Sequence, residues 1–269
     1  ANLTGLQSLD LNGTQVTDLA PIATLTGLQG LDLRGTQVTD FAPVANLTGL
    51  QDLYLRNTQV TDLTAIANLT GLQSLLLRDT RVTDLAPIAN LTDLQRLDLR
   101  GTQVTDLAPV ANLTGLQRLD LMGTQVTDLA PIANLTDLQS LNLSDTQVTD
   151  LRPVLSVIAQ MIERPGTVLA PGLSFTNTPA CQDPAIAAAA EIEDKTERLQ
   201  ALLAHLRTLP PWPEPLPARI DDAPATGPSP EAPDAPPPAR PAPDPGQPDR
   251  STASGPAGRH RPRPLGTTL

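Results

Sequence analysis

The first 22 residues, ANLTGLQSLDLNGTQVTDLAPI, decide the fold, because nearly the same phrase returns six more times without an insertion. Each copy follows the pattern A-x-L-T-x-L-Q-x-L-x-L-x-x-T-x-V-T-D-(L/F)-x-x-(I/V). The copies begin at Ala1, Ala23, Ala45, Ala67, Ala89, Ala111 and Ala133. A fixed period of this kind is the signature of stacked structural repeats, so residues 1–154 are predicted to form an array of seven 22-residue units.

Within each unit, the order of residues predicts a short strand followed by a tight turn. In the first unit Leu9 and Leu11 alternate with polar residues, which is the period of two expected of a half-buried strand. Asp18 then precedes Leu19-Ala20-Pro21, as a capping residue precedes a short 3₁₀ turn. Stacked units place their strands about 4.8 Å apart in a parallel sheet, and the longer turn side bends the array so that the sheet lines the concave face.

The repeated phrase resembles the leucine-rich repeat, and within that superfamily the short 22-residue repeats of bacterial internalin-like proteins. The V-T-D-L-x-P part of the phrase is similar to the D-(L/I)-x-P-(L/I) stretch that follows the strand in those proteins. The resemblance covers residues 1–154. It implies an α/β solenoid, a right-handed coil with a parallel concave sheet and 3₁₀ turns on the convex side.

This sequence departs from the resembled family at one slot, where threonine replaces the usual buried asparagine. The threonines are Thr14, Thr36, Thr58, Thr80, Thr102, Thr124 and Thr146. A threonine hydroxyl can donate to a nearby backbone carbonyl while its methyl group packs inward. We therefore expect a structural ladder of threonines, and the substitution leaves the loop geometry at this slot undetermined.

Residues 155–209 are predicted to form an aberrant eighth repeat and a helical C-terminal cap. The stretch LSVIAQMIE, residues 155–163, predicts a helix on the convex side. The stretch GLSFTNTP, residues 172–179, repeats the strand, with Leu173 and Phe175 in the inward slots and Thr178 in the threonine slot.

The chain from residue 183 to residue 209 predicts a helix that is kinked near Asp194. Its apolar stripe comprises Ile186, Ala190, Leu199, Leu202, Leu203 and Leu206. The end of a solenoid exposes a hydrophobic layer, so we expect this stripe to cover it.

Residues 210–269 differ in composition from the rest, because they hold nineteen of the 29 prolines. Such a segment cannot bury enough apolar area to order itself, which predicts disorder with local polyproline II conformation. We interpret it as a solubilising tail or tether. The PxxP spacings in APPPARPAPDP leave docking to an SH3-like module as an alternative.

The sequence shows no catalytic constellation, so we expect a protein that is not an enzyme and uses no cofactor or metal. His205 is interpreted as a solvated helix residue, and His260 lies in the predicted tail. Cys181, the single cysteine, is interpreted as an inert residue of the cap. The aspartate that recurs once per unit, as at Asp18, is expected to cap its own turn rather than bind calcium.

The net charge and the hydropathy of the chain argue against nucleic-acid binding and against a membrane-spanning helix. The formal net charge of −11 argues against a general affinity for nucleic acid. No run approaches the roughly 18 consecutive apolar residues that a membrane-spanning helix needs, so we expect no membrane span.

Strand alternation places three outward residues per unit on the concave face, where a partner would bind. Four of them form a column of arginines: Arg34, Arg56, Arg78 and Arg100. One interpretation pairs these arginines with neighbouring aspartates, which keeps the face soluble. The other makes them a recognition strip for carboxylates of a partner protein, with three apolar anchors at its centre. The predicted partner-binding residues are Arg34, Asp52, Tyr54, Arg56, Leu76, Arg78, Arg96, Asp98, Arg100, Arg118, Asp120 and Met122, of which Tyr54, Leu76 and Met122 are the anchors.

These observations predict a protein-interaction module, a scaffold or recognition arm that binds a protein partner of unknown identity. The sequence opens at Ala1 in mid-phrase and without methionine, which keeps two alternatives open. One is the regulatory or targeting region of a larger enzyme whose catalytic domain lies upstream of residue 1, and the other is a secreted surface-binding protein. A cytoplasmic location is slightly favoured over a secreted one, and the pattern indicates no oligomeric state.

Overall fold

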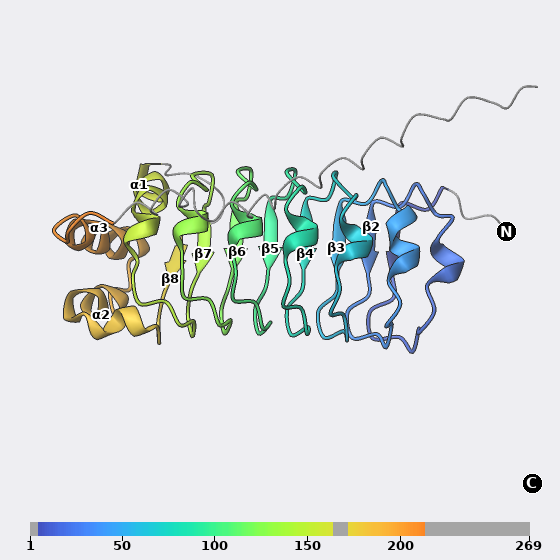
Figure 1. Cartoon of the computed structure of the whole chain (residues 1–269), viewed down its shortest axis with the longest axis horizontal. Helices are drawn as coiled ribbons and strands as arrows, with labels where there is room; N and C mark the ends of the chain where they lie inside the picture. The colour runs from blue at the N-terminus through green and yellow to red at the C-terminus, as the bar shows by residue number, and fades with distance from the viewer. Residues whose placement is uncertain (1–4, 164–171, 213–269) are drawn as a thin grey trace, which may run out of the picture. The chain divides into compact units, whose positions relative to one another are not determined.

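Eight short strands form one parallel sheet in a computed structural model that describes residues 5–163 and 172–212. The strands are β1 (Ser8–Asp10), β2 (Gly30–Asp32), β3 (Asp52–Tyr54), β4 (Ser74–Leu76), β5 (Arg96–Asp98), β6 (Arg118–Asp120), β7 (Ser140–Asn142) and β8 (Gly172–Ser174). They follow one another in chain order (Figure 1). The register moves by one repeat at each step of the array, so that Leu9 pairs with Leu31 and Leu31 with Leu53. The predicted parallel sheet is confirmed.

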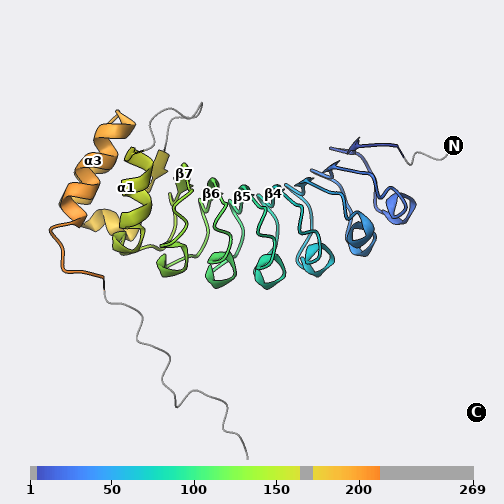
Figure 2. The same ribbon diagram turned by 90° about the horizontal axis from the view of Figure 1, so that it is seen from above.

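A 3₁₀ helix follows each strand on the opposite side of the coil. These helices are η1 (Ala20–Ile22), η2 (Ala42–Asn46), η3 (Thr64–Ile66), η4 (Ala86–Ile88), η5 (Ala108–Val110), η6 (Ala130–Ile132), η7 (Arg152–Val154) and η8 (Pro179–Gln182). Seen from above, the strands line the inner curve of the array and the 3₁₀ helices line the outer curve (Figure 2). The concave sheet and the convex 3₁₀ turns expected of a solenoid are therefore present.

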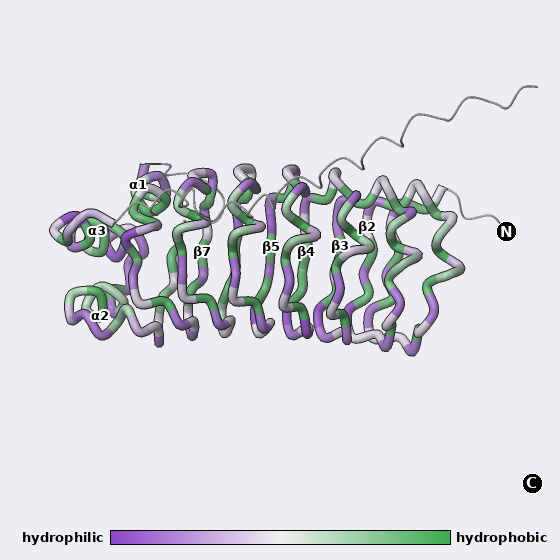
Figure 3. Tube along the Cα trace, in the orientation of Figure 1, coloured by the Kyte–Doolittle hydropathy of each residue, from purple (hydrophilic) through white to green (hydrophobic). Residues whose placement is uncertain are grey.

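The core lies between the sheet and the 3₁₀ helices and consists almost entirely of aliphatic side chains. Leu53, Leu75 and Leu97 are at most 1% exposed, and apolar positions recur in each coil of the array (Figure 3). The corresponding Leu9 of the first repeat is only half-buried. A leucine in this slot is therefore fully buried only when a repeat lies on each side of it. A single repeat in isolation cannot bury its own core.

The recurring aspartate caps the 3₁₀ turn of its own repeat, as the sequence predicted. In the first repeat Asp18 Oδ1 accepts a hydrogen bond of 2.8 Å from the backbone N–H of Ala20. The six later repeats make the same bond at 2.8–2.9 Å. Each carboxylate thus satisfies a backbone donor that the short turn leaves unpaired.

The threonine column is buried, and its hydrogen bonds stay within each repeat. Thr102 Oγ1 donates to the carbonyl of Leu99 at 2.7 Å, and Thr102 is 2% exposed. The other array threonines make the equivalent bond at 2.6–2.7 Å. Only Thr14, in the first repeat, is exposed among them. The hydroxyl therefore closes its own turn, and stacking between repeats is left to the methyl groups and the backbone.

A further set of backbone hydrogen bonds links successive repeats beyond the threonine slot, starting at the junction of the third and fourth repeats. There and at each later array junction, an amide donates to a valine carbonyl of the preceding repeat, as Gln103 does to Val82 at 3.2 Å. Within the described residues, the amides of Gln37 and Gln59 make no such bond. The first two junctions therefore have fewer backbone bonds than the later ones.

The eighth unit and the cap follow the prediction, with one difference. Helix α1 (Leu155–Glu163) leads to β8, where Leu173 and Phe175 are buried and Thr178 Oγ1 donates to the Phe175 carbonyl at 2.8 Å. The predicted kinked helix is instead two helices, α2 (Pro184–Ala190) and α3 (Lys195–Leu206). The helix is interrupted between α2 and α3 because the backbone of Asp194 is extended. The Asp194 side chain caps α3 by accepting a hydrogen bond of 2.8 Å from the N–H of Glu197.

Helices α2 and α3 lie at the C-terminal end of the array (Figure 1). They bury their apolar stripe against the last coil, as expected of a cap. Two residues assigned by sequence to the tail, Pro210 and Trp212, continue this contact. Arg152 donates to the Pro210 carbonyl at 2.9 Å, and its guanidinium lies 5.4 Å from the centroid of the Trp212 ring. The disorder predicted for residues 213–269 lies outside the described residues.

Candidate functional site

The predicted partner-binding residues lie on, or directly after, strands β2 to β6. The register keeps each outward slot in one column, so Asp32 pairs with Tyr54, Tyr54 with Leu76 and Leu76 with Asp98. Met122 is the only large hydrophobic side chain classed as exposed among the described residues, at 41%. The sequence thus placed these residues together on the sheet side of the array.

The column of arginines is held largely by aspartates of this chain. Arg34 Nε lies 2.9 Å from both carboxylate oxygens of Asp32, and Arg100 lies 2.6 Å from Asp98 through Nη2. This hydrogen bond raises the pKa of each arginine. Arg78 pairs with Asp79 at 3.0 Å. The structure therefore favours the pairing interpretation for these side chains over a strip of free guanidinium groups.

Asp98 is the predicted site residue least able to reach a partner, because it is only 4% exposed. Its carboxylate accepts from the guanidinium and from the backbone N–H of Arg100, the latter at 3.1 Å. Arg100 Nε also lies 3.4 Å from Asp120. Burial raises the pKa of Asp120, although a hydrogen bond from the Met122 N–H and the charge of Arg100 oppose this. These three residues form a structural charge network within the face.

Arg96 and Arg118 differ from the other arginines of the face, because neither makes an ion pair with any described residue. They lie in register on β5 and β6. Together with Asp52 and Tyr54 they line a shallow concavity of about 290 Å³ on the sheet. Burial raises the pKa of the Tyr54 hydroxyl, and the charge of Asp52 and a hydrogen bond to it act in the same direction.

Four polar residues that the sequence reasoning did not select complete this concavity: Gln73, Ser74, Gln95 and Gln117. The glutamines occupy a slot that is glutamine in all seven units, so they were taken as part of the repeat pattern. The slot immediately precedes each strand. From that position alone, the glutamines could have been predicted to border the sheet face. We call the concavity, defined by Asp52, Tyr54, Arg96, Arg118 and these four residues, the β3–β6 concavity.

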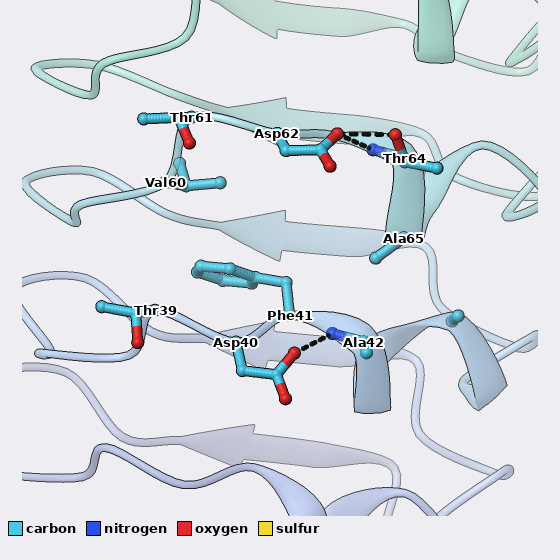
Figure 4. Close-up of a pocket in the computed structure, with 10 residues that line it drawn as sticks. Thr39, Asp40, Phe41, Ala42, Val60, Thr61, Asp62, Thr64 and Ala65 are labelled. Carbon is cyan, nitrogen blue, oxygen red and sulfur yellow. Dashed lines mark hydrogen bonds between the residues drawn. The ribbon is translucent and has the colours of Figure 1, made fainter.

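A larger concavity, of about 470 Å³, lies on the convex side between the second and third repeats (Figure 4). It borders Ala65, which takes the slot held by proline in the other six units. Its two carboxylates are occupied locally: Asp40 accepts from the N–H of Ala42, and Asp62 accepts from the N–H and hydroxyl of Thr64. The hydrogen bonds from Thr64 lower the pKa of Asp62. Nothing in this space converges on a ligand.

The two residues tested for chemistry in the cap have structural contacts. His205 Nε2 lies 2.8 Å from Asp183 Oδ2 and its side chain is 22% exposed, so its interpretation as a solvated residue was wrong. Cys181 is half-buried, and its Sγ donates to the Phe175 carbonyl at 3.3 Å. Across residues 5–163 and 172–212, no three His, Cys, Asp or Glu side chains are arranged to hold a metal ion. In the same residues no helix has the length and apolar character to cross a membrane.

Comparison with known proteins agrees with this architecture. The family model described as Leucine Rich repeats (2 copies) matches residues 4–46, 26–68, 70–112 and 114–156. No curated protein matches the chain. An internalin of Listeria monocytogenes, InlF, is 36% identical with a TM-score of 0.58, over 65% of this chain and 48% of its own. The present chain thus spans about half the length of that relative.

Two further solved structures are similar. Internalin C2 of Listeria monocytogenes is 34% identical with a TM-score of 0.59, over 65% of this chain and 73% of its own. A leucine-rich repeat protein of Leptospira interrogans has the same fold at 21% identity and a TM-score of 0.53, over 66% of this chain and 56% of its own. The seven-fold phrase, the parallel sheet and these matches lead to one conclusion: the chain belongs to the leucine-rich repeat family and is a bacterial internalin-like member of it.

Proposed function

We propose that this protein is a non-enzymatic recognition arm that binds a protein partner on its concave face. Leucine-rich repeat proteins are, in general, protein-interaction modules, and the internalin relatives share this fold. The observation that carries the proposal is the β3–β6 concavity, where Arg96 and Arg118, which make no ion pair among the described residues, lie together with the aromatic side chain of Tyr54. Such a combination of Arg and Tyr is typical of the energetic centre of a protein interface.

The footprint proposed here is narrower than the one predicted from the sequence. Arg34, Asp98 and Arg100 are engaged in ion pairs within the chain, so they contribute shape and rigidity more than new bonds. The footprint that remains is centred on the β3–β6 concavity, with Leu76 in register with Tyr54 and the exposed Met122 two residues after β6. Contacts spread over several strands give a rigid surface, because the strands are fixed by the ladder and by the core behind them.

Site-specific photocross-linking tests this proposal by comparing the two faces of one repeat. A photoreactive phenylalanine analogue is placed either at Leu76 on the sheet or at Ala86 on η4, which is exposed on the convex side. We expect a covalent adduct with a discrete protein from position 76 and none of that mass from position 86. Equal labelling from both positions, or labelling from position 86 alone, would show that the concave face is not the binding surface.

A further inference from the structure

We propose that Arg96 and Arg118 bind carboxylate side chains, so that the partner presents an acidic segment to the centre of the concave face. This inference rests on the proposed function and specifies the chemistry of the partner at that same site. The two arginines occupy the same slot on β5 and β6, and their strands are in register. Neighbouring parallel strands lie about 4.8 Å apart, so the two guanidinium groups can act on one acidic group or on two adjacent ones.

The two arginines are available because closer groups take the aspartates near them. Asp98 and Asp120 are the outward carboxylates on β5 and β6. Arg100 lies 2.6 Å from the first through Nη2 and 3.4 Å from the second through Nε. Arg96 and Arg118 are therefore left without an ion pair among the described residues, and their positive charges face the concavity.

The floor of the concavity suits a carboxylate better than an apolar group. Gln73, Ser74, Gln95 and Gln117 line it with the arginines, and the amides and the hydroxyl of these residue types can donate hydrogen bonds to a carboxylate. Guanidinium groups bind carboxylates through two parallel N–H donors, which gives geometric selectivity as well as attraction. The partner group that matches this lining is an aspartate or glutamate side chain.

The charge of the rest of the molecule makes this site selective. The chain carries a net charge of −11, so an acidic segment is repelled by most of its surface and attracted at this point. Asp52 occupies the same column two strands away from Arg96, about 10 Å on the spacing of parallel strands. A second carboxylate of the partner is excluded there, so the partner is oriented with its acidic end over β5 and β6.

Binding of fluorescein-labelled hexaglutamate to the full chain, measured by fluorescence anisotropy at low ionic strength, tests the inference. We expect binding that weakens as salt is added, and none of labelled hexaglutamine. The R96Q/R118Q variant is expected to bind at least about ten-fold more weakly, because charge-assisted hydrogen bonds to both arginines are lost. R81Q/R207Q makes the same change in net charge at two exposed arginines outside the concave face and is expected to stay within about two-fold of wild type.

Further variants distinguish a specific carboxylate site from non-specific electrostatic attraction of the peptide to the protein. R96K/R118K keeps both charges but loses the paired donors, so we expect affinity between that of wild type and that of the glutamine variant. Circular dichroism confirms that each variant is folded. Equal weakening by R96Q/R118Q and R81Q/R207Q would overturn the inference, and so would inorganic phosphate displacing the peptide at lower concentration than glutarate.

The cross-linking experiment distinguishes failure of this inference from failure of the proposed function. If the partner cross-links at position 76 equally well in the R96Q/R118Q background, the acidic-segment inference is wrong and concave-face binding stands. If position 76 captures no protein while hexaglutamate still requires both arginines, the carboxylate site stands and the concave-face protein partner is wrong.

Discussion

Replacing Arg100 by glutamine would test whether the charge network of the concave face is structural. Arg100 contacts Asp98 through Nε at 3.0 Å and through Nη2 at 2.6 Å, and it lies 3.4 Å from Asp120. The Asp98 side chain is only 6% exposed, whereas that of Arg100 is 31% exposed. Removing one partner of a fully buried pair costs about 3–5 kcal/mol, and the exposure of Arg100 reduces this to about 2–3 kcal/mol.

The matched control is Arg78→Gln, because Arg78 occupies the same slot one repeat earlier and pairs with Asp79, which is far more exposed than Asp98. The side chains of Arg78 and Asp79 are 34% and 44% exposed, so the expected loss is about 0–1 kcal/mol. Urea unfolding followed by circular dichroism at neutral pH measures both variants. With a slope of about 2 kcal/mol per molar, the midpoint should fall by about 1 M for Arg100→Gln and by less than half of that for the control.

The same variants give a test in pH. Burial raises the pKa of Asp120 and Arg100 opposes that rise, so removing Arg100 raises the pKa of Asp120 further. A carboxyl whose folded pKa is above its unfolded value destabilises the fold when ionised, and this cost disappears as the pH falls through the raised pKa. The stability gap between wild type and Arg100→Gln should therefore narrow on acidification from neutral pH. A loss no larger than that of Arg78→Gln, or a gap independent of pH, would refute the reasoning.

Three other properties can be measured independently. In hydrogen–deuterium exchange, the Gln59 amide should exchange faster than that of Gln103, because only the latter donates to the preceding repeat; equal protection would contradict the looser junction. Arg152→Ala should shift the emission of the single tryptophan to longer wavelength, since its ring lies against this guanidinium; an unchanged spectrum would show that the contact does not hold in solution. The hydrogen bond with His205 lowers the pKa of Asp183 below its ordinary value of 3.8. The ionised Asp183 therefore stabilises the cap above pH 3.8, and this contribution is lost as the pH falls through the lowered pKa. Thermal melts of Asp183→Asn should approach those of wild type only below pH 3.8, and a difference that does not change with pH would count against the pairing.

Local patterns in the sequence were enough to predict the repeated coil, the aspartate that caps each turn and the end of the array. The positions of the leucines set the strand and the core, and the aspartate that caps each turn was recognisable because an Asx bond depends on residues two apart. The end of the array was also predictable, since Leu173 and Phe175 repeat the inward slots. The break between α2 and α3 was only suggested, because Asp194 is compatible both with a kink and with a helix start.

The identity of the available arginines could be decided only by the tertiary structure. Sequence reasoning grouped the arginines by column, although Asp-x-Arg at Asp32 and Arg34 puts both charges on one face of one strand, within bonding distance. Arg96 and Arg118 have no aspartate two residues before them in the sequence, but that alone did not show that they are unpaired.

What the repeat determined by itself is the path of the backbone, because each unit has the same neighbours at the same spacing. Which arginines remain without an ion pair depends on contacts between neighbouring strands. Several arginines lie near the same aspartate there, and the one that makes the shortest contact leaves the others unpaired. In this chain Arg100 lies close to both Asp98 and Asp120, and that contact, set by the stacking of β5 on β6, leaves the centre of the face positively charged.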